Sequence, residues 1–177
     1  MTNAISRYRD RTGGFTLLEV LVAVAVLSIG LLGLAGLQVS GLRFNHSAYL
    51  RTQATLLAYE LADRMRANPN RNGANANNYN TTNLAVALVP ACRTPAGCTR
   101  AQIAQNDVAE WQQALARLLP NGQGVVCLDT VPVEAASTPA APDCNGNTAY
   151  AIKIWWNDRG DRNNPDQLER FVVTLAR

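Results

Sequence analysis

The chain has 177 residues, of which 47 % are hydrophobic, and its formal net charge of +3 comes from 16 basic and 13 acidic residues. This length suffices for one globular domain, although much of the apolar content is concentrated near the N-terminus. Three arginines precede residue 15 and the remainder is nearly balanced in charge, which excludes the concentrated cationic surface that general nucleic-acid binding needs, so no nucleic-acid partner is expected.

Residues 1–14 are polar and basic, whereas residues 15–37 are almost entirely apolar. At about 1.5 Å per residue, this apolar segment makes a helix of about 35 Å, which is enough to cross a hydrocarbon core about 30 Å thick. The basic residues in front of it should stay in the cytoplasm, so everything after Leu37 is expected on the far side of the membrane.

One carboxylate, Glu19, lies near the start of the apolar segment. A carboxylate in hydrocarbon costs roughly 2.5 to 3.5 kcal/mol, so Glu19 is expected to have a partner. An ordinary secretory signal would be cut after the apolar segment at small residues. Here the glycine pair Gly13-Gly14 comes before it, which argues that the apolar segment is retained.

The helical pattern continues beyond the apolar segment, with apolar and charged residues on different faces of residues 38–67. Asn68-Pro69 should end the helix, because the residue before a proline disfavours helical dihedral angles. The sequence therefore predicts one long helix, transmembrane in its first half and amphipathic in its second.

The rest of the chain, residues 68–177, is predicted to form a small globular head. An Asn-rich loop over 68–83 precedes a second helix over Asn106–Leu119, in which Asp107 and Glu110 have capping-box spacing and Trp111 is the expected core anchor.

Strands are predicted at Gly124–Thr130, Ala149–Asn157 and Gln167–Ala176. An antiparallel sheet packed on the long helix gives an α+β fold. Trp155 and Trp156 point to opposite faces, so one is expected in the core and the other against the helix or a partner.

Four cysteines, Cys92, Cys98, Cys127 and Cys144, have neither CxxC nor zinc-site spacing. Their even number after a membrane segment suggests two disulfides in an oxidising compartment, with three pairings open. Cys92–Cys98 with Cys127–Cys144 is favoured because each bond closes a short loop rich in Pro, Gly or Asn. Four buried free thiols are the alternative.

Candidate catalytic residues are few. His46 is the single histidine and is interpreted as a surface or packing residue. Asp158, Asp161 and Asp166 cluster with asparagines (Asn157, Asn163, Asn164) that could hold Ca²⁺, but their spacing is not that of an EF-hand, and a solvated turn is favoured. No phosphate-binding or dinucleotide glycine motif is present. We expect no cofactor, no metal and no enzymatic activity.

The string Gly13-Gly14-Phe15-Thr16-Leu17-Leu18-Glu19-Val20, followed by an apolar helix, closely resembles the type IV prepilin signature of pilins and type II secretion pseudopilins. This resemblance implies that prepilin peptidase cuts between Gly14 and Phe15 and methylates the new N-terminus at Phe15. It also implies that Glu19 pairs with the terminal amine of a neighbouring subunit and sets the axial register of the fibre. Gly36 stands where many major pilins have a proline, and its neighbouring glycines allow either local melting or close helix packing.

Three further motifs resemble the PilV group of minor pilins: Ala62–Pro69, the helix with Glu110-Trp111 that ends at Leu119–Gly122, and the strand Tyr150–Asp158. This resemblance implies a low-abundance subunit that joins other minor pilins and the major pilin at the assembly platform and helps to prime the type IV pilus. The implied location is the inner membrane, with a periplasmic head, and then the pilus (fimbrium) at the cell surface. A minor pseudopilin of type II secretion and a membrane-tethered periplasmic enzyme are the alternatives.

Overall fold

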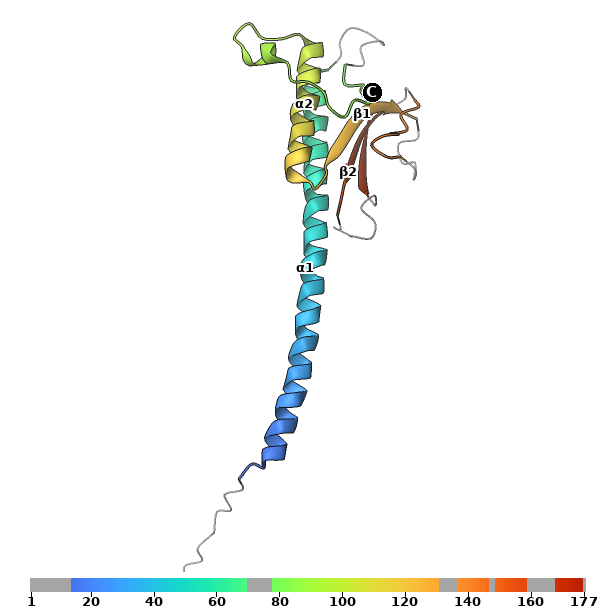
Figure 1. The fold of residues 1–177 in the computed structure, drawn as a ribbon. Coiled ribbons are helices and arrows are strands. Elements are labelled where there is room, and N and C mark those ends of the chain that lie inside the picture. The colour runs from blue at the N-terminus through green and yellow to red at the C-terminus, as the bar shows by residue number, and fades with distance from the viewer. Residues whose placement is uncertain (1–13, 70–77, 131–136, 147–148, 159–167, 177) are drawn as a thin grey trace, which may run out of the picture. The chain divides into compact units, whose positions relative to one another are not determined.

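The computed structural model describes residues 14–69, 78–130, 137–146, 149–158 and 168–176 (Figure 1). The chain divides into two compact units, residues 1–44 and residues 45–177. The elements in chain order are α1 (Leu17–Ala67), the 3-10 helix η1 (Pro90–Arg93), α2 (Arg100–Leu118), β1 (Gln123–Asp129), β2 (Ala149–Trp156) and β3 (Glu169–Ala176).

The first unit contains the N-terminal half of α1. Thr16 caps the helix, because its Oγ1 accepts a hydrogen bond from the Glu19 amide at 3.2 Å. The large apolar side chains from Phe15 to Phe44 are all at least half exposed, from 51 % at Val22 to 84 % at Phe15. The helix is long and apolar enough to cross a membrane. It continues without a break through Gly36.

The second half of α1 is amphipathic, as predicted, and packs into the second unit. One face is buried: Leu50, Ala54, Leu57, Ala58, Leu61 and Ala62. The opposite face exposes Tyr49, Leu56 and Tyr59. The helix ends at Ala67, directly before the Asn68-Pro69 stop.

Helix α2 begins earlier than predicted. The expected start at Asn106 is wrong because Thr99 and Gln102 form the capping box: the Thr99 Oγ1 accepts from the Gln102 amide and the Gln102 side chain accepts from the Thr99 amide. Asp107 and Glu110 therefore lie inside α2 and do not cap it. Trp111 is a core anchor, as predicted, and its Nε1–H donates to the Leu57 carbonyl at 3.0 Å.

The three strands form an antiparallel sheet in the order β1-β2-β3. Their bounds differ from the predicted ones only at the ends: β1 runs from Gln123 to Asp129 and β2 stops at Trp156. The predicted start of the third strand, Gln167, lies outside the described residues. One face of the sheet joins the core with α1 and α2 through Ile152, Ile154 and Trp156.

The other face of the sheet has a smaller core of Val125, Cys127 and Trp155, against which Leu168 also packs. Trp155 and Trp156 are only 1 % and 2 % exposed. The two indoles do lie on opposite faces, but the idea that one of them meets a partner is wrong, because the head itself covers both.

We expect Leu61→Ala to destabilise the head by about 2 to 5 kcal/mol, because it opens a cavity in the main core. Leu56→Ala, on the exposed face of the same helix, should stay within about 0.5 kcal/mol of wild type. Urea unfolding of the detergent-solubilised protein measures both. Equal losses would contradict the assignment of the two faces.

Candidate functional site

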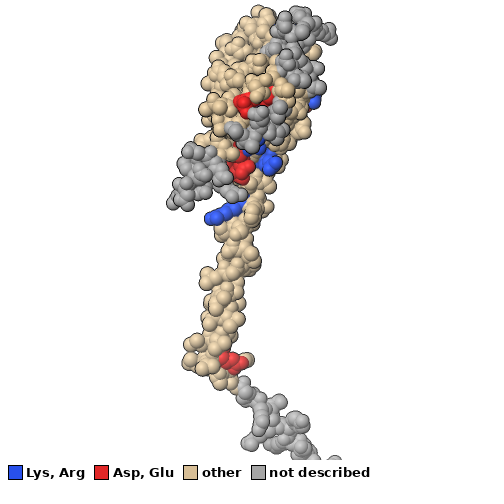
Figure 2. All heavy atoms as spheres, turned by 90° about the vertical axis from the view of Figure 1, so that its right-hand side faces the viewer, with Lys and Arg blue, Asp and Glu red and all other residues tan. Residues whose placement is uncertain are grey.

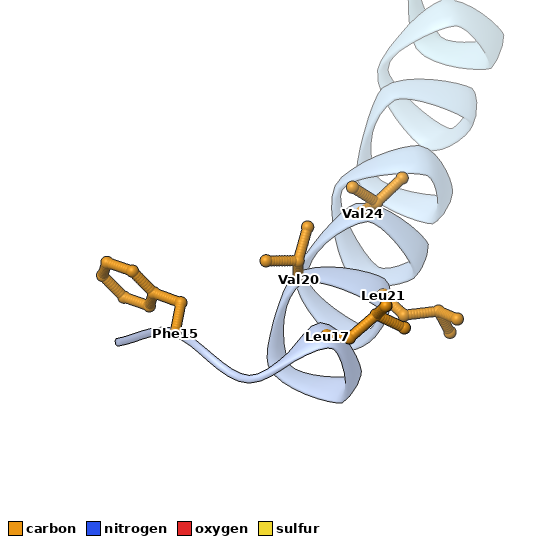
Figure 3. Close-up of a pocket in the computed structure, with 5 residues that line it drawn as sticks. All are labelled: Phe15, Leu17, Val20, Leu21 and Val24. Carbon is orange, nitrogen blue, oxygen red and sulfur yellow. The ribbon is translucent and has the colours of Figure 1, made fainter. Parts of the chain in front are cut away.

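The candidate processing and assembly residues, Gly14, Phe15 and Glu19, lie at the start of the first unit. Phe15 precedes the first turn of α1 and lines a shallow, open hollow with Leu17, Val20, Leu21 and Val24 (Figure 3). This hollow is apolar and its lining comes from one stretch of chain. It is therefore part of the exposed surface of the helix, and none of its lining side chains is polar and able to orient a small ligand.

Glu19 occupies the first turn of α1 and its side chain is exposed. A negative charge there is favoured by the helix dipole. Figure 2 shows an acidic side chain near the start of the described part of this unit, within a surface that is otherwise drawn as uncharged until the next basic side chains. Among the described residues, no cation lies within ion-pair distance of the Glu19 carboxylate. Over residues 14–37, Glu19 is thus the single charged side chain, within a largely apolar surface.

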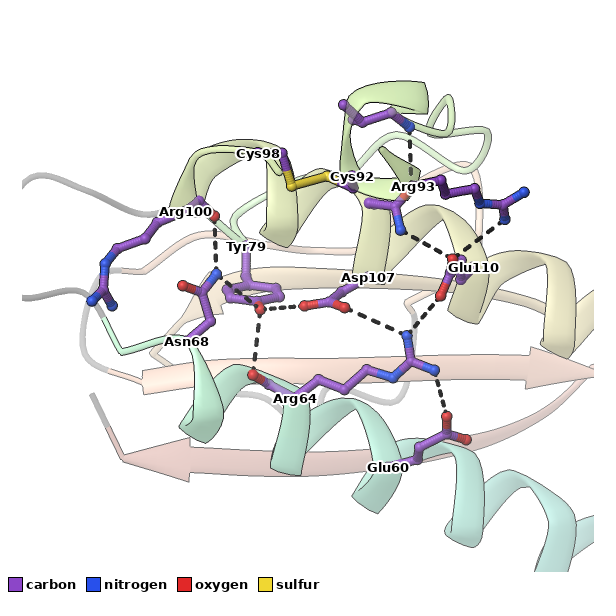
Figure 4. Close-up of polar contacts among 12 residues, drawn as sticks. Glu60, Arg64, Asn68, Tyr79, Cys92, Arg93, Cys98, Arg100, Asp107 and Glu110 are labelled. Carbon is purple, nitrogen blue, oxygen red and sulfur yellow. Dashed lines mark hydrogen bonds and ion pairs between the residues drawn. A yellow bond between two sulfur atoms is a disulfide. The ribbon is translucent and has the colours of Figure 1, made fainter. Parts of the chain in front are cut away.

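In the head, a polar cluster around Arg64 joins α1 to α2 (Figure 4). The guanidinium of Arg64 bonds Glu60 at 2.7 Å, Glu110 at 3.1 Å and Asp107 at 3.4 Å. The hydrogen bond from Arg64 holds the pKa of Glu110 below its usual range. Arg93 of η1 also bonds Glu110, at 3.4 Å, so the cluster reaches the first disulfide loop.

Tyr79 completes this Arg64 cluster. Its hydroxyl donates to the Asp107 carboxylate at 2.7 Å and accepts from the Asn68 amide at 3.3 Å. Burial, together with the hydrogen bond to Asp107, raises the pKa of Tyr79. The Asn68 amide also donates to the Arg100 carbonyl at 2.9 Å. The end of α1 is therefore tied to the start of α2.

Sequence reasoning assigned the wrong role to Asp107 and Glu110. Their spacing was interpreted as a capping box, but both carboxylates bond Arg64, which lies more than forty positions earlier in the chain (separations of 43 and 46). Their three-residue spacing places them on one helix face, which was the available signal for a shared cation.

The cysteines form the two disulfides Cys92–Cys98 and Cys127–Cys144, with Cα–Cα distances of 4.8 and 5.8 Å. This pairing is the one that the sequence analysis favoured, because each bond closes a short loop rich in Pro, Gly or Asn. The first bond closes a loop that begins at Cys92 within η1 and turns at Gly97, whose φ is +71°. The second bond ties β1 to the segment before β2.

A buried ion pair, which the sequence analysis missed, lies beside the second disulfide. Lys153 Nζ is 2.5 Å from Asp129 Oδ2, and both side chains are completely buried. The same ammonium donates to the carbonyls of Pro142 at 2.7 Å and Asp143 at 3.0 Å. The neighbouring Trp155 was the available sign that this face of the sheet is also covered.

The residues considered for catalysis or metal binding do not form a site in the described part of the chain. His46 is exposed. Asp158 accepts a hydrogen bond from Ser47, while Asp161, Asp166, Asn163 and Asn164 lie outside the described residues. Within those residues, no cluster of three His, Cys, Asp or Glu side chains could hold a metal ion.

Two family models match the chain. Residues 9–35 match the prokaryotic N-terminal methylation motif, and residues 36–109 match a family described as type IV pilin Tt1218. No similar protein was found among curated proteins or among solved structures.

The class of protein that these findings support is the type IV prepilin superfamily. The long N-terminal helix packed on a small antiparallel sheet is consistent with a pilin fold. The matches further support a pilin-like, structural role in a pilus or pseudopilus, with an inner-membrane anchor and processing by prepilin peptidase.

The Tyr79 pKa makes the stability of the head sensitive to alkali. Because the folded pKa is above the unfolded value of about 10, the proton stabilises the fold fully below about pH 10, and this contribution is lost as the pH rises further. We expect the free energy of unfolding of wild type to fall above pH 10 more steeply than that of Tyr79→Phe. Parallel pH profiles from urea unfolding would contradict this.

Lys153→Met should destabilise the head by about 3 to 5 kcal/mol, because it removes the cation that faces a buried carboxylate. Adding Asp129→Asn in the same chain should recover much of the loss, since it removes that charge while keeping a polar side chain. The measurement is urea unfolding of wild type, single and double variants. A double variant less stable than the single one would show that the charge is not the cause.

Proposed function

We propose that the chain is a minor pilin of the PilV group, which helps to prime assembly of the type IV pilus. The observation that carries the proposal is the methylation motif followed directly by a helix whose apolar surface is exposed all round and includes Glu19. Such a helix needs either lipid or the helices of other subunits around it. The helix of a pilin is surrounded by lipid before assembly and by the helices of other subunits after it.

In this proposal, residues 1–14 are the leader peptide and residues 15–37 are the transmembrane and fibre-core half of the helix. Residues 38–67 are the amphipathic half, and residues 68–177 complete the periplasmic head. Prepilin peptidase removes the leader after Gly14 and methylates Phe15. The partners are other minor pilins, the major pilin and the assembly platform in the inner membrane.

The proposed assembly step pairs two charges in an apolar setting. Cleavage gives the mature chain a cationic amine at Phe15, and Glu19 presents a carboxylate one turn further along the helix. An ion pair between the amine of one subunit and the Glu19 of its neighbour removes both unpaired charges. Breaking such a buried pair costs about 3 to 5 kcal/mol, so the pair discriminates between correct and shifted registers.

The head has a structural role in this proposal, with no catalysis. Its Arg64 cluster is satisfied by side chains of the head itself: Arg64 is bonded by three carboxylates and Tyr79 bonds Asp107. The same features suit a minor pseudopilin of a type II secretion system, since the methylation motif serves both kinds of fibre. Recovery of the protein in sheared pili, and its absence from fibres of a secretion system, separates the two.

Replacing Gly14 with glutamate should block processing, because the peptidase requires a small residue before the cut. We expect Gly14→Glu to accumulate in the membrane at the mass of the full chain. Intact-mass analysis of the membrane fraction measures this. A normally processed Gly14→Glu chain would refute the assigned cleavage position.

Glu19→Ala should leave processing and membrane insertion intact but reduce recovery of the protein in sheared fibres, because the register pair cannot form. Asp63→Ala is the matched control: its carboxylate lies on the same helix, 74 % exposed, and pairs only with Arg66 among the described residues. Quantitative immunoblots of membrane and sheared fractions measure both. Equal recovery of Glu19→Ala and wild type would contradict the assembly step.

A further inference from the structure

The two outer edges of the sheet differ. On the β1 edge, the Val126 carbonyl accepts a hydrogen bond from the amide of Thr81, in an isolated bridge at 2.7 Å. This bond shows that the main-chain groups of Val126 point away from β2. In an antiparallel strand the direction alternates, so Gly124 and Leu128 also point their main-chain groups outward.

Two further outward main-chain groups of β1 also form hydrogen bonds with side chains of the head. The Gly124 carbonyl accepts from the Gln112 side chain at 3.0 Å. The Leu128 amide donates to the Asn80 side chain at 3.0 Å. The head itself therefore covers the β1 edge at Gly124, Val126 and Leu128.

The same alternation identifies the outward groups of β3. Because Val126 faces away from β2, its register partner Ile152 directs its main-chain groups toward β3, where it is paired with Val173. Val173 thus bonds to β2, and its neighbours Val172 and Thr174 direct their main-chain groups away from the sheet. Among the described residues, these outward groups of Val172 and Thr174 have no hydrogen-bond partner.

The open edge lacks the features that usually keep strands apart. Its pairing with β2 runs in register from Glu169 to Ala176 without a bulge, and charged side chains occur only at its first two positions. The strand contains no proline. Regular edges without a bulge or a proline are templates for pairing with another chain.

The side chains beside this edge are also incompletely covered. Phe171 and Val173 pack against the main core but stay partly exposed. A strand added next to β3 would place every second side chain over them. An apolar residue at those positions would extend the core.

We propose that β3 receives an extended segment of a different subunit, with an apolar residue at every second position, and so fixes this chain to its neighbour by strand addition. This inference rests on the proposed function. A second copy of this chain is the less suitable occupant. Its β1 edge already bonds Asn80, Thr81 and Gln112 of the same head, so it has no sheet edge to offer other than β3 itself.

Thr174→Pro tests the edge directly. Its amide points outward and makes no bond to β2, so proline removes a donor that only an added strand would use, and edge strands tolerate proline at such positions. Val173→Pro is the matched control, because it removes an amide that bonds to β2 and should prevent folding. Near-ultraviolet circular dichroism of the full chain in detergent establishes which variant folds.

Folded Thr174→Pro should be processed and inserted normally but recovered in sheared fibres at a level several-fold below wild type. A photo-crosslinking residue at position 174 of the full chain should join it to a different subunit. Wild-type recovery of Thr174→Pro, or a crosslink to a second copy of this chain, would overturn the inference. Absence of the wild-type protein itself from fibres would instead refute the proposed function.

Amide exchange gives a measurement that does not depend on a variant. In the detergent-solubilised chain, the amides of Val172 and Thr174 should exchange quickly and that of Val173 slowly. In sheared fibres, exchange at Val172 and Thr174 should slow by about tenfold or more, as for hydrogen-bonded strands. Unchanged fast exchange at both positions in fibres that contain the protein would contradict strand addition.

Discussion

The exposed apolar surface of residues 15–44 is the constraint on which the rest of the protein depends. Side chains such as Phe15, Leu32 and Leu37 are more than 70 % exposed, so they need a lipid or protein environment that the chain's own described residues do not supply. A helix of this composition is stable in a bilayer, and it is equally suited to a bundle of similar helices. The same apolar helix surface is thus suited both to anchoring in a membrane and to packing against similar helices.

Contacts between distant parts of the chain hold the head in one conformation. The Arg64 cluster fixes the end of α1 against α2, and two disulfides close the loop before α2 and join β1 to the segment before β2. The Lys153–Asp129 pair holds the segment before β2 over the second face of the sheet. Buried ion pairs add little net stability compared with apolar side chains, but their hydrogen bonds permit few alternative arrangements.

The features that follow from local sequence could be predicted. The end of α1 at Asn68-Pro69 and the strand alternation around Ile152 and Ile154 depend on residues close together in the chain. The start of α2 was missed because two capping boxes were available, and Thr99–Gln102 was the one used. The roles of Asp107 and Lys153 could not be obtained this way, because their partners, Arg64 and the carbonyls near Cys144, come together only through the tertiary fold.

The candidate assembly residues were found from the sequence because they form one contiguous string, and no tertiary contact is needed to place them. The most direct test of this account is intact-mass and N-terminal analysis of the protein from its native membrane, with and without prepilin peptidase. The account predicts a chain that starts at methylated Phe15 only when the peptidase is present. A chain that starts at Met1 in both cases, or after residue 37, would contradict it.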